Sequence, residues 1–129
     1  MIVVCCIFVA CGGADQDPCE ETLPSSCSPL YEPTFTQVYT QTLQVKCAVT
    51  GGACHSAAGA KGGLILEGED AAYAGLVESG RVIPGEPECG ELTHRLESTD
   101  AAIVMPVGGN LSEPERCAIY AWIRAGALR

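Results

Sequence analysis

The chain has 129 residues, which is enough for one folded domain, and it carries a formal net charge of −9 at pH 7. An acidic chain is poorly suited to bind nucleic acid through phosphate contacts, so we expect no nucleic-acid partner. The sequence also contains no nucleophile elbow and no recognisable pair of catalytic carboxylates, so we do not expect an enzyme.

An apolar run from Ile2 to Ala10 lies at the start of the sequence. It is too short to cross a bilayer, which needs about 20 residues, but its length suits the apolar part of a secretion signal. The small residues before Cys11 and the glycines after it resemble a bacterial lipobox, in which the cysteine is lipidated. We therefore expect residues 1–11 to be a lipoprotein signal, with Cys11 anchoring the protein to the bacterial cell envelope, facing the periplasm or the cell surface. No Lys or Arg precedes the run, and a buried strand of a cytosolic protein is the alternative interpretation.

Residues 12–32 are rich in proline, serine and acidic residues and contain few apolar ones. This composition is typical of a flexible spacer, so we expect a polar tether between the lipidated cysteine and the folded part. Cys19 and Cys27 lie within this segment. The folded domain is expected to span residues 33–129.

Two helices are expected in the first half of this domain. The apolar side chains of residues 35–43 are mostly spaced three and four apart, as they are on one face of a helix. Residues 70–80 predict a second, short helix, with Asp70 as its N-cap and Gly80 at its end.

Two more helices are expected in the second half. Residues 89–98 predict the third, with two leucines facing inward. Residues 110–127 predict the fourth, in which Ser112 and Glu115 form a capping box. Glycine and proline punctuate the connections. The sequence therefore predicts a small all-α domain of about four short helices joined by Gly/Pro-rich loops.

The stretch CAVTGGACHS, residues 47–56, carries the most specific chemical signal. Two cysteines followed directly by a histidine form the pattern by which a protein attaches haem covalently and supplies an iron ligand. The usual gap between the cysteines is two residues, whereas six separate Cys47 from Cys54. A continuous helix would place them ~10 Å apart. Residues 48–53 must therefore bulge, which Gly51-Gly52 makes easier.

The same two cysteines have other interpretations. Oxidised to a disulfide, Cys47 and Cys54 would close a small loop, and the domain would keep its shape without a cofactor. A zinc site built from four cysteines is a third use of such thiols, but zinc sites usually bring their cysteines in close pairs, and here only two pairs are even loosely spaced.

Four landmarks, taken in order, resemble the small cytochrome c-like domains of exported planctomycete and myxobacterial lipoproteins. Over residues 35–129 they are CAVTGGACHS, GGLILEGEDAAYAGL, GRVIPGEPECGELTHRLES and VMPVGGNLSEPERCAIYAWIRAGA. The resemblance implies a cytochrome c-like fold and a single haem c, attached through Cys47 and Cys54. It implies His55 as the proximal iron ligand and Met105, in the Met-Pro of the last landmark, as the second axial ligand.

His94, in the third expected helix, is another candidate for the second iron ligand. It would give a bis-histidine site in place of the pair of His55 and Met105. We expect His94 to be a surface histidine instead.

Nine cysteines are many for a reducing compartment, which agrees with export. If Cys47 and Cys54 hold haem, four remain after the signal, and three pairings are open. They are Cys19, Cys27, Cys89 and Cys117. We favour Cys89–Cys117 together with Cys19–Cys27, because one disulfide then lies within the domain and the other within the tether.

Two functions remain in view at this point. The first is a lipid-anchored c-type cytochrome that transfers one electron at a time to or from a redox partner protein. The second is a haem-free, disulfide-stabilised interaction domain of a lipoprotein. The six-residue gap between the cysteines favours the second, and the presence of Met105 favours the first.

Overall fold

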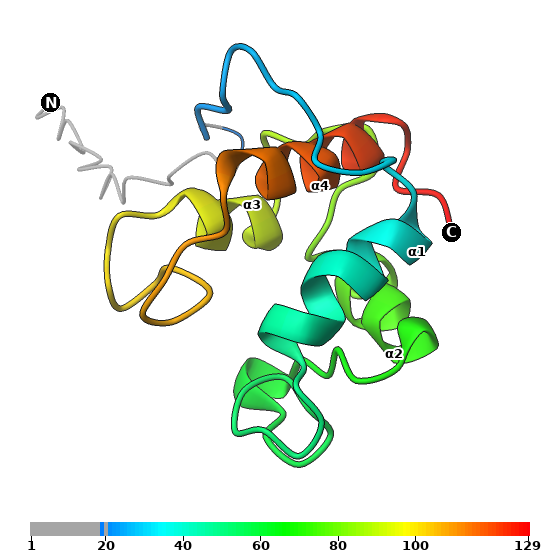
Figure 1. Cartoon of the computed structure of the whole chain (residues 1–129), viewed down its shortest axis with the longest axis vertical. Helices are drawn as coiled ribbons and strands as arrows, with labels where there is room; N and C mark the ends of the chain where they lie inside the picture. Colours follow the sequence, from blue (N-terminus) through cyan, green and yellow to red (C-terminus); the bar gives the residue numbers. More distant parts are fainter. Residues whose placement is uncertain (1–18, 20) are drawn as a thin grey trace, which may run out of the picture.

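Helices are the only regular secondary structure in the computed structural model, which describes residue 19 and residues 21–129 (Figure 1). The all-α prediction is confirmed for these residues. The expected signal and the expected lipid site at Cys11 lie outside them. Within the described range, no helix is long and apolar enough to cross a membrane.

The first helix leads directly to the cysteine–histidine motif. It begins as α1 (Phe35–Val38) and continues without a break as the π-helical segment η1 (Tyr39–Cys47). Thr34 caps α1, because its hydroxyl accepts a hydrogen bond from the Gln37 N–H at 3.3 Å. A short 3₁₀ turn, η2 (Lys61–Gly63), follows the motif.

The second helix consists of α2 (Glu69–Tyr73) followed by the π-helical segment η3 (Ala74–Glu78). Gly80 ends it with a left-handed φ of 79°, as the sequence predicts. The prediction that Asp70 is the N-cap is wrong. Gly68 occupies that position, and Asp70 lies in the first turn, where its negative charge favours the helix through the macrodipole instead.

Helices α3 (Glu91–Glu97) and α4 (Glu113–Arg124) lie within the two remaining predicted stretches. The predicted capping box of α4 is present, because the backbone N–H of Ser112 donates to the Glu115 carboxylate at 2.8 Å. Leu96 of α3 is buried, and Leu92 packs partly buried against the core, so both leucines face inward.

The aromatic residues form the centre of the core, where α1 packs against α4. The Phe35 ring lies 5.1 Å from Trp122 and 5.0 Å from Tyr73, the second in an edge-to-face arrangement. The indole N–H of Trp122 donates to the Leu128 carbonyl at 2.8 Å, so the buried ring keeps its hydrogen bond. Three large aromatic side chains, those of Phe35, Tyr73 and Trp122, therefore meet where α1 packs against α4.

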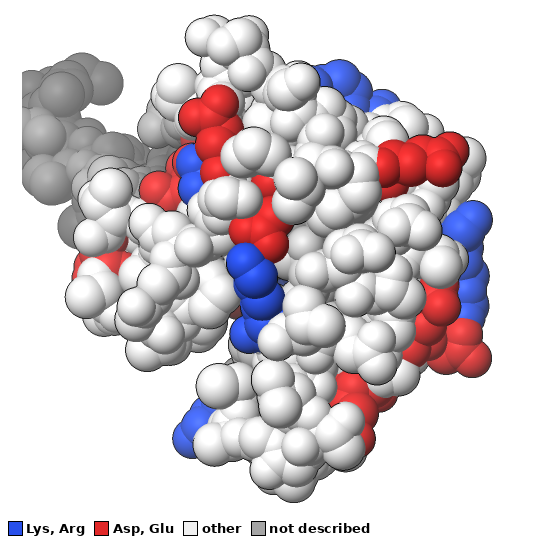
Figure 2. All heavy atoms as spheres, viewed as in Figure 1, with Lys and Arg blue, Asp and Glu red and all other residues white. Residues whose placement is uncertain are grey.

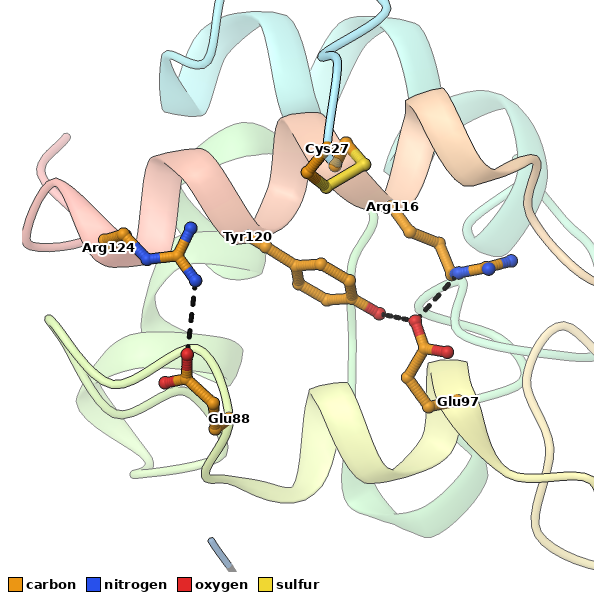
Figure 3. Close-up of a disulfide and its surroundings, with 7 residues drawn as sticks. Cys27, Glu88, Glu97, Arg116, Tyr120 and Arg124 are labelled. Carbon is orange, nitrogen blue, oxygen red and sulfur yellow. Dashed lines mark hydrogen bonds and ion pairs between the residues drawn. A yellow bond between two sulfur atoms is a disulfide. The ribbon is translucent and has the colours of Figure 1, made fainter. Parts of the chain in front are cut away.

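A partly buried polar contact joins α3 to α4 (Figure 3). The Glu97 carboxylate accepts from Tyr120 Oη and, at 2.8 Å, from Arg116 Nε. Burial raises the pKa of Tyr120 far above its usual value, and the Glu97 carboxylate adds to the effect. Tyr120 therefore remains protonated and acts as a hydrogen-bond donor.

The favoured disulfide pairing is wrong. All four expected cysteines form disulfides, but the bonds are Cys19–Cys89 and Cys27–Cys117. Both join the N-terminal segment to the helical domain. The physical reason is that this segment runs along α4 and brings Cys27 to a Cα distance of 5.3 Å from Cys117, within the range a disulfide spans.

Residues 21–32, expected as part of a tether, pack on the domain. Leu23, Cys27 and Tyr31 lie partly buried against the core. The N–H of Leu30 donates to the Pro114 carbonyl at 2.9 Å. In the described part of the chain, the polar composition of this segment thus reflects its solvent-facing side chains and does not indicate a free spacer.

Candidate functional site

One mostly apolar pocket of about 280 Å³ lies between the cysteine–histidine motif and the loop that precedes α4. Figure 2 shows the molecular surface hollowed between the lower loop and the loops at the left of Figure 1. Leucines from η1, η3 and α3 and from the loops that precede α2 and α4 line the pocket, together with Ile119 of α4. They include Leu43, Leu64, Leu76, Leu96 and Leu111.

His55 lines this pocket and is held by three hydrogen bonds. Its backbone N–H donates to the Cys47 carbonyl at 3.2 Å, and its own carbonyl accepts from the Leu66 N–H at 2.7 Å. Its ring Nδ1 lies 3.2 Å from the Leu64 carbonyl. A carbonyl can only accept, so this bond fixes the proton on Nδ1 and leaves Nε2 with a free lone pair. Metal-binding histidines are usually oriented in this way.

The strap that orients His55, residues 64–68, is itself held in place. The Glu67 carboxylate accepts from the Ala57 N–H at 2.8 Å, and the Gly68 N–H donates to Tyr39 Oη at 2.9 Å. The buried Tyr39 thus connects η1 to the strap. Sequence reasoning did not identify this strap, because a backbone carbonyl carries no residue-type signal.

Met105 lines the same pocket. Its backbone N–H donates to the Arg95 carbonyl of α3 at 2.9 Å, and the Arg95 guanidinium donates to the Ile103 carbonyl at 3.3 Å. Arg95 therefore holds both sides of the turn that carries Met105. The structure brings together His55 and Met105, which lie fifty residues apart in the sequence, at one cavity.

The two remaining predicted site cysteines differ in position. Cys47 lines the pocket, whereas the Cys54 side chain is exposed and is not part of the lining. Both are free thiols, although the other four described cysteines form disulfides. Burial and the neighbouring Cys54 raise the pKa of Cys47 to about 11, partly offset by Lys46. The Cys47 thiol is therefore protonated at neutral pH.

The six residues between these cysteines form the predicted bulge. The helix ends at Cys47, since Ala48 leaves the helical region with φ −124°. Gly51 takes a left-handed φ of 73°, and the Gly52 N–H donates to the Val49 carbonyl at 2.8 Å, which closes a turn. The bond from the His55 N–H to the Cys47 carbonyl then returns the chain to the end of the helix, so the long gap is compatible with a compact motif.

The zinc interpretation finds no geometric support among the described residues. Residues 19 and 21–129 contain one cluster of three potential metal ligands whose ligand atoms lie within 4.8 Å of one another. It consists of Cys19, Glu86 and Cys89. Its two cysteines form a disulfide with each other and so offer no thiolate. Cys47, Cys54 and His55 do not form such a cluster in the described part of the chain.

His94 lies away from this site. Its Nδ1 is 2.6 Å from the Glu21 carboxylate of the N-terminal segment, and it does not line the pocket. The His94 side chain is about half exposed, which agrees with the expectation that it is a surface histidine.

A known protein family matches the part of the chain that contains most of this site. Residues 52–107 match the family described as Planctomycete cytochrome C. This match supports a cytochrome c-like domain of the planctomycete type. It includes Cys54, His55 and Met105 but begins after Cys47. No curated protein matches the chain, and no solved structure matches it either.

The residues around the pocket fit a haem. The cavity offers an apolar surface of the kind a porphyrin needs, a histidine with Nε2 free and a thioether sulfur. These are the axial donors found in cytochromes c. A free thiol in the lining and a second in the next turn of chain supply the groups for covalent attachment.

Proposed function

We propose that the protein is an exported, lipid-anchored cytochrome c-like electron carrier, and not an enzyme, with a single covalently attached haem c. In this proposal Cys47 and Cys54 hold the haem through thioethers, His55 is the proximal ligand and Met105 the distal one. Lipidation at Cys11 would anchor it in the cell envelope, where it would exchange electrons with a redox partner protein.

The observation that carries the proposal is the orientation of His55 in a pocket that it shares with Met105. The Leu64 carbonyl fixes the ring proton on Nδ1, so the unprotonated Nε2 is the ring atom available to a metal. The family match to residues 52–107 supports the same assignment.

When bound, a haem supplies one-electron chemistry, and a methionine ligand raises its reduction potential. The chain supplies the surroundings. Leucine side chains give the pocket an apolar lining, His55 keeps its proton at Nδ1, and Arg95 holds the turn of Met105. A fixed ligand set and an apolar pocket suit electron transfer, because both limit the rearrangement that accompanies a change of charge.

Expression in an exporting host with haem attachment machinery tests the proposal. We expect a coloured protein whose mass exceeds that of the polypeptide by one haem. His55→Ala should prevent stable haem incorporation. Met105→Ala should retain the covalent haem but lower the reduction potential and remove the weak red absorption band of a methionine-ligated ferric haem. His94→Ala is the matched control and should change neither property.

The proposal would be contradicted by a colourless product in which a disulfide joins Cys47 and Cys54. The mass of that product would be lower by two hydrogens than the mass of the polypeptide with both thiols free. That result would instead support the haem-free interaction domain.

The lipid anchor has an independent test. We expect the full chain to partition into detergent and Cys11→Ser to remain in the aqueous phase. Equal partitioning of both proteins would contradict the anchor while leaving the haem proposal untouched.

A further inference from the structure

The pocket lining carries a net positive charge, although the chain as a whole is acidic. The chain has 7 basic and 16 acidic residues, yet Lys61, Arg81 and Arg95 line the pocket together with one carboxylate, that of Glu91. An otherwise acidic protein therefore presents an excess of two positive charges at one edge of an apolar cavity. Such a combination suits a ligand with an apolar body and an anionic end.

Backbone carbonyls hold the Arg81 guanidinium in place. It donates to the Gly62 carbonyl at 3.2 Å, to the Gly75 carbonyl at 3.3 Å and to Ser79 Oγ at 3.0 Å. These bonds to neutral oxygen atoms position the charge without cancelling it. Gly90, at a φ of 96°, lets α3 approach, since a Cβ there would lie 2.9 Å from the Arg81 carbonyl.

The one carboxylate at this edge is shared between two cations. Glu91 lies 3.4 Å from Arg81 Nε and 3.4 Å from Arg95 Nη2, and it is about half exposed. Long, exposed ion pairs of this kind are weak and leave the guanidinium groups able to bind another anion. The Lys61 ammonium makes no ion pair with any of the described residues.

We propose that Lys61, Arg81 and Arg95 form a carboxylate-binding edge that receives the two propionate groups of the haem. This inference rests on the proposed function, because it takes the ligand to be haem. The excess of two positive charges matches two carboxylates. The arrangement sets the haem's orientation, with the propionates beside η2 and α3.

Binding of a porphyrin to the full chain, produced without haem attachment and with its disulfides intact, tests the edge. The probes are zinc protoporphyrin and its dimethyl ester, which differ only in the charge of the two propionates. Trp122 is the only tryptophan, so quenching of its fluorescence reports binding. We expect the free acid to bind roughly tenfold more tightly than the ester, as charge-assisted hydrogen bonds provide, and to lose this advantage in high salt.

Lys61→Gln carries the mutational test, because Arg81→Gln also removes the bonds to Gly62 and Gly75. We expect Lys61→Gln to weaken binding of the free acid by roughly two- to fivefold and to leave binding of the ester unchanged. Arg81→Lys, which keeps the charge, should retain most of the preference for the acid. Arg124→Gln is the matched control, since Arg124 pairs with Glu88 at 3.2 Å and does not line the pocket.

In the haem-loaded protein, Lys61→Gln should also lower the reduction potential, because a nearby positive charge disfavours the more positive ferric state. A purely structural role for Lys61 would leave the potential unchanged. Equal affinities for the free acid and the ester would contradict the carboxylate-binding edge. Equal effects of Lys61→Gln and Arg124→Gln on binding of the free acid would contradict it too. Neither result would contradict covalent attachment of the haem. Failure of both probes to bind, together with a colourless product, would overturn the proposed function and the edge with it.

Discussion

Two regions of the molecule use cysteine differently. The region formed by the N-terminal segment, α3 and α4 is cross-linked by two disulfides, and its cysteines lie far apart in sequence, 70 and 90 residues. The motif region, residues 47–68, holds two free thiols only seven residues apart and is organised by hydrogen bonds around His55. The contrast indicates that the first set of sulfur atoms stabilises the fold, whereas the second set is available for chemistry.

The largest difference between the regions should appear in stability. Cys27→Ala combined with Cys117→Ala should cost about 2–5 kcal/mol of unfolding free energy, because it frees a long loop in the unfolded state and removes a staple of the N-terminal segment. Cys54→Ser, at an exposed position, should cost less than about 0.5 kcal/mol. Urea unfolding of the haem-free chain measures both changes in unfolding free energy. Equal losses would contradict the conclusion that the disulfides, and not the motif cysteines, stabilise the fold.

Thiol reactivity should separate the two motif cysteines from each other. With a pKa of about 11, Cys47 is almost entirely protonated at pH 8. Because the thiolate is the nucleophile, Cys47 should react with iodoacetamide on the order of 100-fold more slowly than a free cysteine of pKa about 8.5. Its rate should rise with pH up to about 11. Mass spectrometry of the labelled peptides measures this, and labelling of Cys47 as fast as an unstructured cysteine would contradict the burial argument.

An ion pair joins η1, the helix that leads into the motif region, to α4 of the cross-linked region, and it should make stability depend on pH. Lys46 Nζ, one residue before Cys47, lies 2.6 Å from the buried Glu115 carboxylate. Burial opposes ionisation of Glu115, but the bonds from Lys46 and Ser112 outweigh it and hold its pKa below the ordinary value.

A lowered pKa means that this carboxylate stabilises the fold above pH about 4.5 and that the contribution is lost as the pH falls through the folded-state pKa. Glu115→Gln should cost about 1–3 kcal/mol at pH 7 and less at pH 3. Thermal unfolding from pH 7 to pH 3 measures the difference between the variants. A cost that stays constant over this range would show that packing, and not charge, is responsible.

The sequence predicted the local features of both regions better than the disulfides that join distant segments, and the reason is physical. Helix periodicity, the capping box of Ser112 and the bulge at Gly51 depend on neighbours within a few residues. Disulfide pairing depends instead on how the N-terminal segment crosses α4, which no local pattern encodes. The same limit applies to the site. His55 and Met105 follow from a motif and a resemblance, but the carbonyl of Leu64 and the convergence of Arg81 with Arg95 follow only from the fold.

The smallest effect is expected at the surface of the cross-linked region. Arg124 of α4 and Glu88 lie 3.2 Å apart, and both side chains are about half exposed (Figure 3). Solvent screening and side-chain entropy offset most of the attraction between such groups. A double-mutant cycle with Arg124→Gln and Glu88→Gln should therefore give a coupling of less than about 0.5 kcal/mol that disappears in 1 M salt. A coupling as large as that of Lys46 with Glu115 would mean that the polar contacts between α3 and α4 act as one network with Glu97 and Arg116, because an isolated exposed pair cannot supply it.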